Sequence, residues 1–275
     1  MRVHLITVVG GYVDVLPFML EHYRSLGIED FLVNVHLRDR GDAVIDEVQR
    51  VTTRFGCAAP TTFVGDWQSQ QERVWRQAMR RHADDWCVLA DQDELHRYPD
   101  ELSSLLAYCD RHGYDVLTGA FVDRVSADGR FPAVQPGQPI AAQFPCGGFV
   151  SYPLLGADPR KVVAAKGRVV VVRGQHLALS GRACPIDEAF VQVHHYKWTG
   201  GLVARLRERA ALLRRNGVAH WTESDRFVRY CESHGERLDL TDPRLMIAPC
   251  APDYPYWDRL TGMARAHAAA VRVAR

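Results

Sequence analysis

The sequence predicts an α/β fold, in which a mainly parallel central sheet carries helices on both faces. Hydrophobic residues make up 47% and charged residues 24%, which is the composition of an ordinary globular protein. Short apolar runs alternate with stretches of helical periodicity through residues 2–90. Runs in that order and of those lengths form parallel strands that are connected by helices.

The elements follow one another from the amino terminus. Residues 2–9 are an apolar run that ends at Gly10-Gly11, which predicts a buried strand. We then expect helices at residues 15–26, 43–55, 68–82 and 100–112, and strands at residues 31–35, 59–64, 86–90, 115–122, 168–173 and 189–194. The Gly- and Pro-rich residues 128–153 predict surface loops, and helical patterns return at residues 202–215, 222–234 and 256–272. We therefore expect an α/β domain at residues 1–200 and a helical C-terminal extension, residues 201–275, packed on it.

The charge and the apolar runs exclude several classes of protein. The formal net charge is +1, so no general attraction to nucleic acid is expected. Every apolar run is shorter than the ~20 residues that a membrane span needs, and residues 5–9 are too short for the core of a signal peptide. The seven cysteines show no C-x-x-C spacing, which predicts reduced thiols. We expect a cytoplasmic protein with no membrane span.

An acidic block follows the apolar run at residues 86–90. Asp91-Gln92-Asp93-Glu94 places three carboxylates where a buried strand ends, and ligands bind beyond the carboxyl ends of such strands. Crowded anions repel unless a cation offsets them, and Mg²⁺ and Mn²⁺ prefer oxygen ligands. The alternative is a solvated loop whose acids cap the next helix. The position behind an apolar strand favours a metal site at Asp91 and Asp93.

A second group of candidate metal ligands lies near the last predicted strand. His194 and His195 are adjacent in a strand, so their side chains should face opposite ways, and one of them can complete a metal shell. His176 is a further candidate. The alternative is that these side chains are ordinary core or surface groups. We assign that structural reading to the histidines elsewhere: His4, His82, His112, His220, His234 and His267.

Lysine is rare in this chain and confined to one region. Of the 34 basic residues, the lysines are Lys161, Lys166 and Lys197. A lysine kept where arginine otherwise prevails suits a site that needs a compact charge, although chance clustering is the alternative.

These blocks together resemble the metal-dependent glycosyltransferases of the GT-A fold, in the family-2-like branch. The resemblance rests on residues 16–28, on Trp86 to Glu94 and on His195-Tyr196-Lys197, and it covers about residues 1–200. It implies the GT-A fold and a nucleotide-sugar-binding and catalytic domain at residues 1–200. It also implies that Asp91 and Asp93 hold Mn²⁺ or Mg²⁺ against the diphosphate of a nucleotide-sugar donor, with a UDP-type donor expected. Glu94 then orients a ligand or touches the acceptor, and Lys161, Lys166 or Lys197 adds positive charge at the phosphates.

The resemblance further implies a nucleoside pocket. Residues Val9, Gly10 and Gly11 would line it together with Asp39 or Asp42, and Gln71 and Arg73 are further candidates on the donor side. The family usually carries Asn, Ser or Asp residues after the second strand. In this chain, residues 36–42 supply a less familiar set.

Inverting transfer requires a base for the acceptor hydroxyl, and Asp187-Glu188 is our candidate pair. The alternative is that Asp187 and Glu188 lie in a solvated turn after Pro185. If no carboxylate is positioned to act as the base, a retaining mechanism becomes more credible. We expect a small-molecule or glycan acceptor. A second copy of the chain is a further candidate partner, for the aromatic cluster at residues 254–257.

Two other functions compete with glycosyl transfer. A sugar-nucleotidyltransferase has a similar sheet and similar carboxylate–metal chemistry, but it usually carries a basic Gly-rich loop, and Gly10-Gly11 has no Arg or Lys beside it. A non-catalytic nucleotide- or sugar-binding module on the same scaffold is the other alternative.

Overall fold

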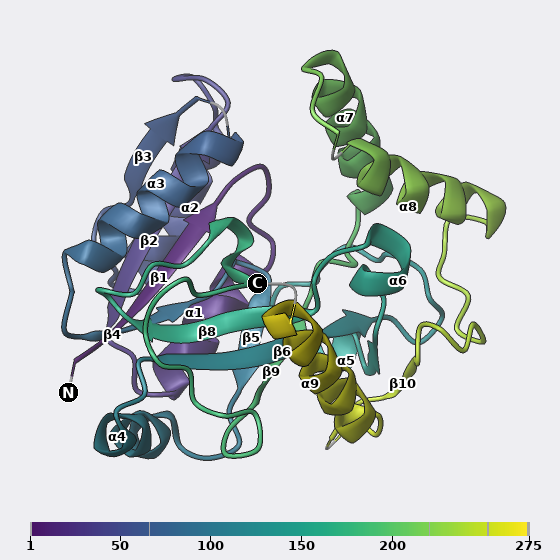
Figure 1. Ribbon diagram of the computed structural model, residues 1–275. Helices are drawn as coiled ribbons and strands as arrows, with labels where there is room; N and C mark the ends of the chain where they lie inside the picture. Colours follow the sequence, from purple (N-terminus) through teal and green to yellow (C-terminus); the bar gives the residue numbers. More distant parts are fainter. Residues whose placement is uncertain (1, 66, 220, 252, 274–275) are drawn as a thin grey trace. The chain divides into compact units, whose positions relative to one another are not determined.

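Four parallel strands form the first part of the fold. The computed structural model describes residues 2–65, 67–219, 221–251 and 253–273 (Figure 1). Its contacts divide the chain into unit 1, residues 1–120 and 160–193, and unit 2, residues 121–159 and 194–275. In unit 1, β1 (Val3–Val9), β2 (Asp30–Leu37), β3 (Thr61–Val64) and β4 (Trp86–Leu89) lie in the order β3-β2-β1-β4. All neighbouring pairs among them are parallel.

Helices connect the parallel strands. They are α1 (Leu16–Ser25), α2 (Val44–Arg54) and α3 (Trp67–Arg80). Helix α3 packs against β1 and β2 (Figure 1). Its Trp75 and Met79 share a buried cluster with Ile6 of β1 and Leu89 of β4. The near-continuous apolar sequences of β1 and β4 are typical of parallel strands that are covered on both faces.

Four further strands extend the sheet beyond β4. Strand β8 (Arg160–Lys166) pairs with β4, and β6 (Val116–Val125) pairs with β8, both antiparallel. Strand β5 (Glu94–Arg97) pairs with β9 (Val191–His195), and β9 also pairs with β6. Helix α4 (Leu102–His112) precedes β6. The predicted α/β class with parallel N-terminal strands is confirmed, and the sheet is mixed.

Three details of the predicted element order need correction. The strand predicted at residues 168–173 is wrong: this segment makes an isolated bridge, Val171 to Ala178, and the strand lies just before it as β8. The acidic block continues directly into β5, which was not expected. The segment predicted as loops, residues 128–153, also contains α5 (Ile140–Gln143), β7 (Cys146–Gly148) and the start of α6 (Ser151–Leu155).

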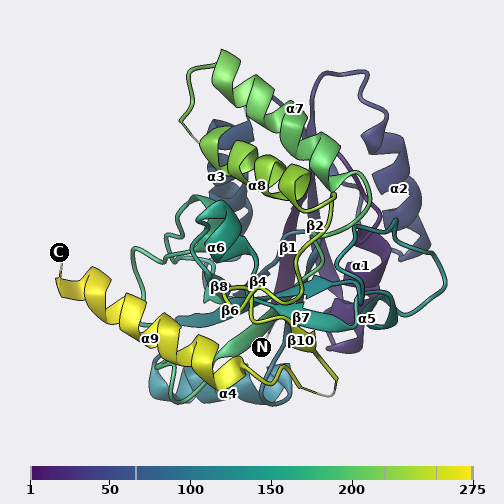
Figure 2. The same ribbon diagram turned by 90° about the vertical axis from the view of Figure 1, so that its right-hand side faces the viewer.

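Unit 2 is built around short strands and helices. The end of β6 pairs with β7, and β7 pairs with β10 (Ala248–Pro249). Helices α7 (Leu202–Arg215) and α8 (Trp221–Ser233) lie side by side, as Figure 2 shows, and α6 contacts α8. Leu154, Trp198, Leu206 and Phe227 belong to its buried core. Helix α9 (Trp257–Val273) follows. The division of the chain at residue 200 stays a prediction.

Membrane insertion has no candidate segment among the described helices. None of the helices in that part of the chain combines the length and the apolarity that crossing a bilayer requires.

Candidate functional site

The acidic block forms a tight turn at the carboxyl end of β4. The register of β1 and β4 pairs Ile6 with Leu89, so the segments that follow these two strands lie next to each other. The chain turns at once after Ala90, because the backbone N–H of Glu94 donates to the carbonyl of Asp91 at 3.0 Å. This turn gathers Asp91, Asp93 and Glu94 within four residues of chain.

Lys161 pairs with two of the three carboxylates. Its Nζ donates to Oε1 of Glu94 at 2.6 Å and to Oδ2 of Asp91 at 3.1 Å. The Lys161 and Glu94 side chains are 2% and 1% exposed, whereas the Asp91 side chain is 31% exposed. Burial alone lowers the pKa of Lys161, but the charges of Asp91 and Glu94 outweigh it, so the net pKa is raised and the ammonium stays charged. Lys161 is therefore held by carboxylates, and the role at the donor phosphates that the resemblance implied for it stays a prediction.

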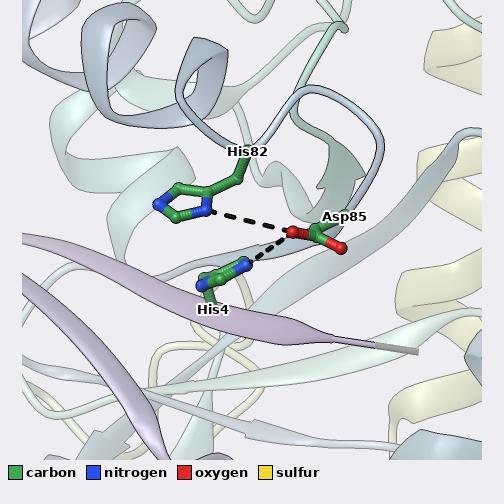
Figure 3. Close-up of side chains that lie close together, drawn as sticks. All are labelled: His4, His82 and Asp85. Atoms are coloured by element: carbon green, nitrogen blue, oxygen red, sulfur yellow. Dashed lines mark hydrogen bonds and ion pairs between the residues drawn. The ribbon is translucent and has the colours of Figure 1, made fainter.

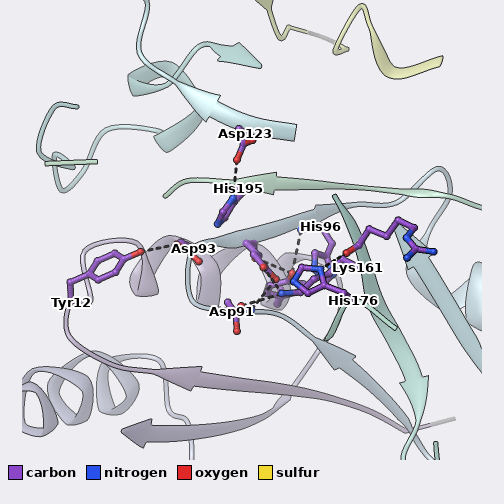
Figure 4. Close-up of polar contacts among 11 residues, drawn as sticks. Tyr12, Asp91, Asp93, His96, Asp123, Lys161, His176 and His195 are labelled. Atoms are coloured by element: carbon purple, nitrogen blue, oxygen red, sulfur yellow. Dashed lines mark hydrogen bonds and ion pairs between the residues drawn. The ribbon is translucent and has the colours of Figure 1, made fainter. Parts of the chain in front are cut away.

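Tyr12 holds the third carboxylate. Its hydroxyl donates to Oδ2 of Asp93 at 2.6 Å (Figure 4). Tyr12 follows Gly11, whose φ of +78° is a backbone conformation that favours glycine. The Gly10-Gly11 turn after β1 therefore places a phenol beside the acidic turn after β4.

Three carboxylates and one ammonium gather in this cluster. Lys161 supplies its ammonium to Asp91 (Figure 4) and to Glu94. Asp93 and Glu94 are buried, and the side chain of Asp91 is partly exposed. Crowded carboxylates repel one another, and a divalent ion offsets that repulsion. The side-chain oxygen of Gln92, between the two aspartates, is buried and has no hydrogen-bond partner within the described residues.

A strained turn adjoins β8 and α3 in unit 1. The 3₁₀ turn η1 (Arg173–Gln175) contacts both elements. Gln175 has a φ of +56° and is buried, and both polar atoms of its side-chain amide lack partners within the described residues. Non-glycine residues in this conformation are uncommon, and strain of this kind gathers at functional sites. The next residue, His176, directs Nδ1 to the carbonyl of Arg160 at 2.7 Å, beside Lys161 in the chain.

In unit 2, a buried carboxylate organises the second group of predicted ligands. Asp123 of β6 accepts from the backbone N–H groups of Val150 and Ser151 at 2.8 and 2.6 Å, and from the Ser151 hydroxyl at 2.8 Å. It also accepts from His195 Nδ1 and Trp198 Nε1, both at 2.9 Å. Burial alone raises the pKa of Asp123, but His195 and Ser151 lower it further than burial raises it, so Asp123 is an anion at neutral pH.

The two adjacent histidines face opposite ways, as expected for a strand. The His195 ring stacks on Phe121 with centroids 4.6 Å apart, and its Nδ1 points to Asp123 (Figure 4). In the neutral ring, Nε2 then carries the lone pair. His194 faces Arg124, whose Nη1 lies 2.8 Å from Nδ1 of the histidine. A guanidinium only donates, so Nδ1 of His194 is an acceptor there and the arginine competes with a metal ion for it.

The predicted nucleoside-pocket residues lie at the carboxyl ends of β1 and β2. Val9 ends β1, and Gly10 and Gly11 follow it beside the acidic turn. The carboxylates after β2 are used in local turns: Asp39 accepts from the N–H of Gly41 at 2.8 Å. Asp42 accepts from the backbone N–H of Arg38 at 3.0 Å and of Val44 at 3.2 Å. The Arg38 hydrogen bond is the main cause that lowers the pKa of Asp42. On α3, Gln71 is buried, whereas Arg73 is exposed and donates to Gln70 at 2.9 Å.

Lys166 lies at the amino end of β4 and not beside the acidic turn. It pairs with Trp86 in the β4–β8 register, and its Nζ lies 2.8 Å from Oδ1 of Asp110. Lys161, five residues earlier on the same strand, contacts Asp91 and Glu94 of the acidic turn, whereas Lys166 lies at the other end of β4. Lys197 belongs to unit 2, where its Nζ lies 6.0 Å from the ring centroid of Trp198.

The candidate base pair also lies away from the acidic turn. Asp187 and Glu188 are exposed in a turn before β9, and Glu188 accepts from the hydroxyls of Tyr108 and Tyr114 at 2.7 and 3.0 Å. Tyr114 lies two residues before β6, and the first residue of β6, Val116, pairs with Ala165 of β8, which pairs with Cys87 near the start of β4. The Tyr108 hydrogen bond is the main cause that lowers the pKa of Glu188. The role of Asp187 and Glu188 as a catalytic base stays a prediction.

Residue patterns predicted part of this site and missed part of it. The structure brings Asp91, Asp93, Glu94 and Lys161 together in unit 1. It places His195 in unit 2, so the expected approach of His195 to the aspartates stays a prediction. Tyr12, Gln175 and Asp123 were missed. The signal for Tyr12 was its position after Gly10-Gly11, and the signal for Asp123 was a carboxylate inside an apolar strand.

Comparisons with known proteins give distant structural similarity alone. No model of a known protein family and no curated protein sequence matches the chain. A mannosyltransferase from Pyrobaculum calidifontis, solved with GDP-Man and Mn²⁺, is 16% identical over 43% of this chain and 35% of its own, with a TM-score of 0.34. S. aureus TarS is 14% identical over 50% and 23%, with a TM-score of 0.32. HddC from Yersinia pseudotuberculosis is 9% identical over 46% and 60%, with a TM-score of 0.31. The chain thus spans less than two thirds of each of these proteins.

Proposed function

We propose that this chain is a metal-dependent glycosyltransferase, with Mn²⁺ or Mg²⁺ as its cofactor. It transfers a sugar from a nucleoside diphosphate-sugar, of the UDP type, to a hydroxyl group of a small-molecule or glycan acceptor. The observation that carries the proposal is the gathering of Asp91, Asp93 and Glu94 at the carboxyl end of β4, beside the turn that follows β1.

The residues of the acidic turn fit a hard divalent ion. Asp91 and Asp93 offer carboxylate oxygens, and Gln92 between them has a buried amide oxygen without a partner in the described part of the chain. Mg²⁺ and Mn²⁺ take oxygen ligands and are held by one or two carboxylates together with substrate phosphates. When bound, the ion supplies Lewis-acid stabilisation of the leaving nucleoside diphosphate.

The surrounding groups keep the two aspartates in position. Lys161 and the backbone N–H of Asp91 both donate to Glu94, so this buried carboxylate supports the turn from within. Lys161 also holds Oδ2 of Asp91, and Tyr12 holds Oδ2 of Asp93. Hydrogen bonds that orient ligating carboxylates in this way influence metal affinity.

Glu94 therefore acts in our proposal as a positioning residue. The resemblance implied a contact of Glu94 with a ligand or with the acceptor. Its side chain is buried and accepts from Lys161 Nζ and from the N–H of Asp91, so support of the turn is the role that these contacts favour.

The contacts of His195 determine the orientation of its ring and the nitrogen that carries the lone pair, Nε2. Asp123 accepts the Nδ1 proton and Phe121 stacks on the ring, which together define its tautomer and orientation. A neutral imidazole held in this way can bind a metal ion or accept a proton through Nε2, and the expectation that it does so beside Asp91 and Asp93 stays a prediction from the sequence. Asp187 and Glu188 remain the carboxylate alternative for accepting the proton.

A binding experiment tests the proposal directly. We expect UDP to raise the midpoint of thermal unfolding in the presence of Mn²⁺, and to raise it little without the metal. In Asp93→Asn the metal-dependent rise should disappear, because the substitution removes a charge and keeps the shape of the side chain. Asp46→Asn, on the exposed side of α2, is the matched control and should behave as the wild type.

The other outcomes of this experiment are equally informative. A rise with another nucleoside diphosphate would change the proposed donor base, and a rise with nucleoside triphosphates alone would favour a sugar-nucleotidyltransferase. An Asp93→Asn variant that responds to Mn²⁺ and UDP as the wild type does would remove Asp93 from the site and refute the proposal. Hydrolysis or transfer of UDP-sugars, measured by release of UDP, then distinguishes an enzyme from a binding module.

A further inference from the structure

Two histidines and an aspartate meet at the amino ends of β1 and β4. They are His4 of β1, His82 in the turn after α3, and Asp85 directly before β4 (Figure 3). Because parallel strands begin at this edge of the sheet, the group lies at the opposite end of β4 from Asp91. The sequence suggested ordinary structural roles for His4 and His82, and the three-dimensional arrangement suggests a different interpretation.

The three side chains converge on one point. One ligand atom from each of them lies within 4.8 Å of the other two. His4 Nε2 is 3.0 Å and His82 Nδ1 is 4.0 Å from the same oxygen of Asp85 (Figure 3). The two imidazole rings face each other, with centroids 3.7 Å apart and planes inclined by 33°.

The group is buried on one side and open on the other. The His4 side chain is fully buried, whereas the side chains of His82 and Asp85 are 22% and 36% exposed. An ion can therefore enter from solvent beside His82 and Asp85 and reach a nitrogen of the buried His4.

Asp30, at the start of β2, provides an independent observation. Its Oδ2 lies 2.6 Å from Nδ1 of His4, so the ring is held with Nε2 directed toward Asp85. A histidine that binds a metal through one ring nitrogen almost always directs the other to a carboxylate, a carbonyl or water. The pair of Asp30 and His4 reproduces that arrangement.

We propose that this group is a binding site for a divalent transition-metal ion of the zinc class. His4 Nε2, His82 Nδ1 and the Asp85 carboxylate are the ligands, and Asp30 is the positioning residue. Two imidazole nitrogens and one carboxylate oxygen form a donor set that Zn²⁺ accepts, and a water molecule completes four-coordination from the open side. The ion takes the place of the hydrogen bond between His4 Nε2 and Asp85.

The position of the site predicts stabilisation of the fold and not catalysis. Its ligands come from β1 and from the connection between α3 and β4, and the positioning residue Asp30 comes from β2. A bound ion therefore links these three parts of the sheet. Zn²⁺ at 100 times its dissociation constant should raise the midpoint of thermal unfolding by about 5 °C, because binding to the folded state alone shifts the unfolding equilibrium.

The experiment uses the full chain after treatment with a chelator and its removal. Titration calorimetry with ZnCl₂ should show saturable binding of one equivalent. Binding should weaken at least about tenfold in His82→Ala and in Asp85→Asn, and about ten- to a hundredfold in Asp30→Asn, which keeps all three ligands. His82 and Asp85 are partly exposed, so both variants are expected to fold, which thermal unfolding without metal verifies. His112→Ala removes an exposed histidine outside the group and should bind Zn²⁺ as the wild type does.

Results of three kinds would overturn this inference. They are no saturable binding of Zn²⁺ by the wild type, equal binding by the wild type and His82→Ala, and loss of binding in Asp93→Asn with retention in His82→Ala. The third result would place the zinc ion at the acidic turn. The inference does not depend on the proposed function, because nucleotide and Mn²⁺ are absent from the titration.

Discussion

Replacement of Lys161 by methionine tests how the acidic turn is held together. Methionine keeps a flexible, unbranched stem and removes the ammonium that pairs with Glu94 and Asp91. The carboxylate of Asp91 is partly exposed, so water can solvate it after the substitution, whereas Glu94 is 1% exposed and would lose a cationic partner without gaining solvent.

The expected loss follows from that difference. Removing one partner of a buried ion pair costs about 3–5 kcal/mol of stability. Glu94 keeps the hydrogen bond from the backbone N–H of Asp91 at 3.0 Å, so we expect the lower value, about 3 kcal/mol. In a chain of 275 residues this corresponds to a fall of about 6 °C in the midpoint of thermal unfolding.

Three further variants make this test specific: Lys166→Met, Glu94→Gln, and the double variant. Lys166→Met removes a lysine of the same strand whose partner, Asp110, is 40% exposed, so the loss should be about 1 kcal/mol or less. Adding Glu94→Gln to Lys161→Met replaces the stranded carboxylate by a neutral amide. The double variant should therefore be more stable than the sum of the two single losses predicts, by at least about 1 kcal/mol.

Urea denaturation followed by circular dichroism measures the wild type, the three single variants Lys161→Met, Lys166→Met and Glu94→Gln, and the double variant. Equal losses in Lys161→Met and Lys166→Met would refute the reasoning, because they would mean that burial of the partner carboxylate has no effect. Strict additivity of Lys161→Met and Glu94→Gln would refute it as well, because the two side chains would then not interact.

Two other predictions concern the sheet and the pH dependence of stability. Gly119 of β6 has no room for a side chain, because a Cβ would lie 2.3 Å from the carbonyl oxygen of Val191; Gly119→Ala should cost about 3 kcal/mol in urea denaturation, and a loss below about 0.5 kcal/mol would contradict the strand packing. Burial is the main cause that lowers the pKa of His22, so the unfolded chain binds a proton at this residue more readily than the folded chain does. The contribution of the neutral His22 to stability is complete above pH 6.5, the pKa of histidine in the unfolded chain. This contribution is lost as the pH falls through the lower pKa of His22 in the folded chain. The midpoint of thermal unfolding should fall less between pH 7.5 and 5 in His22→Gln than in the wild type, and identical pH profiles would contradict this assignment.

The parallel half of the fold was predictable from local patterns, but the position of β8 was not. Residues 168–173 read Arg-Val-Val-Val-Val-Arg and have the stronger strand propensity, whereas Arg160–Lys166 contains charged residues and alanines. The pairing of this second segment with β4 and β6 decides the outcome. Its two lysines tolerate burial because Glu94 and Asp110 face them, and those partners lie more than fifty residues away in the sequence.

The candidate site shows the same limit. Asp91 and Asp93 were recognisable because an apolar strand stops directly before them. The roles of Tyr12, Asp30 and Asp85 depend on the register between β1, β2 and β4, which a single sequence does not reveal. Asp123 was hidden for a related reason: the predicted strand ended at residue 122, whereas β6 continues through Val125.

The chain passes between its two units three times, after residues 120, 159 and 193. No single cut therefore yields either unit as one continuous polypeptide. A fragment that ends at residue 193 would keep Val125 and Leu154 but lose Leu206 and Phe227, with which they form a core, and it would expose apolar surface that promotes aggregation. Producing unit 1 alone requires a gene in which residues 121–159 are replaced by a designed loop that joins residues 120 and 160, and in which the chain ends at residue 193.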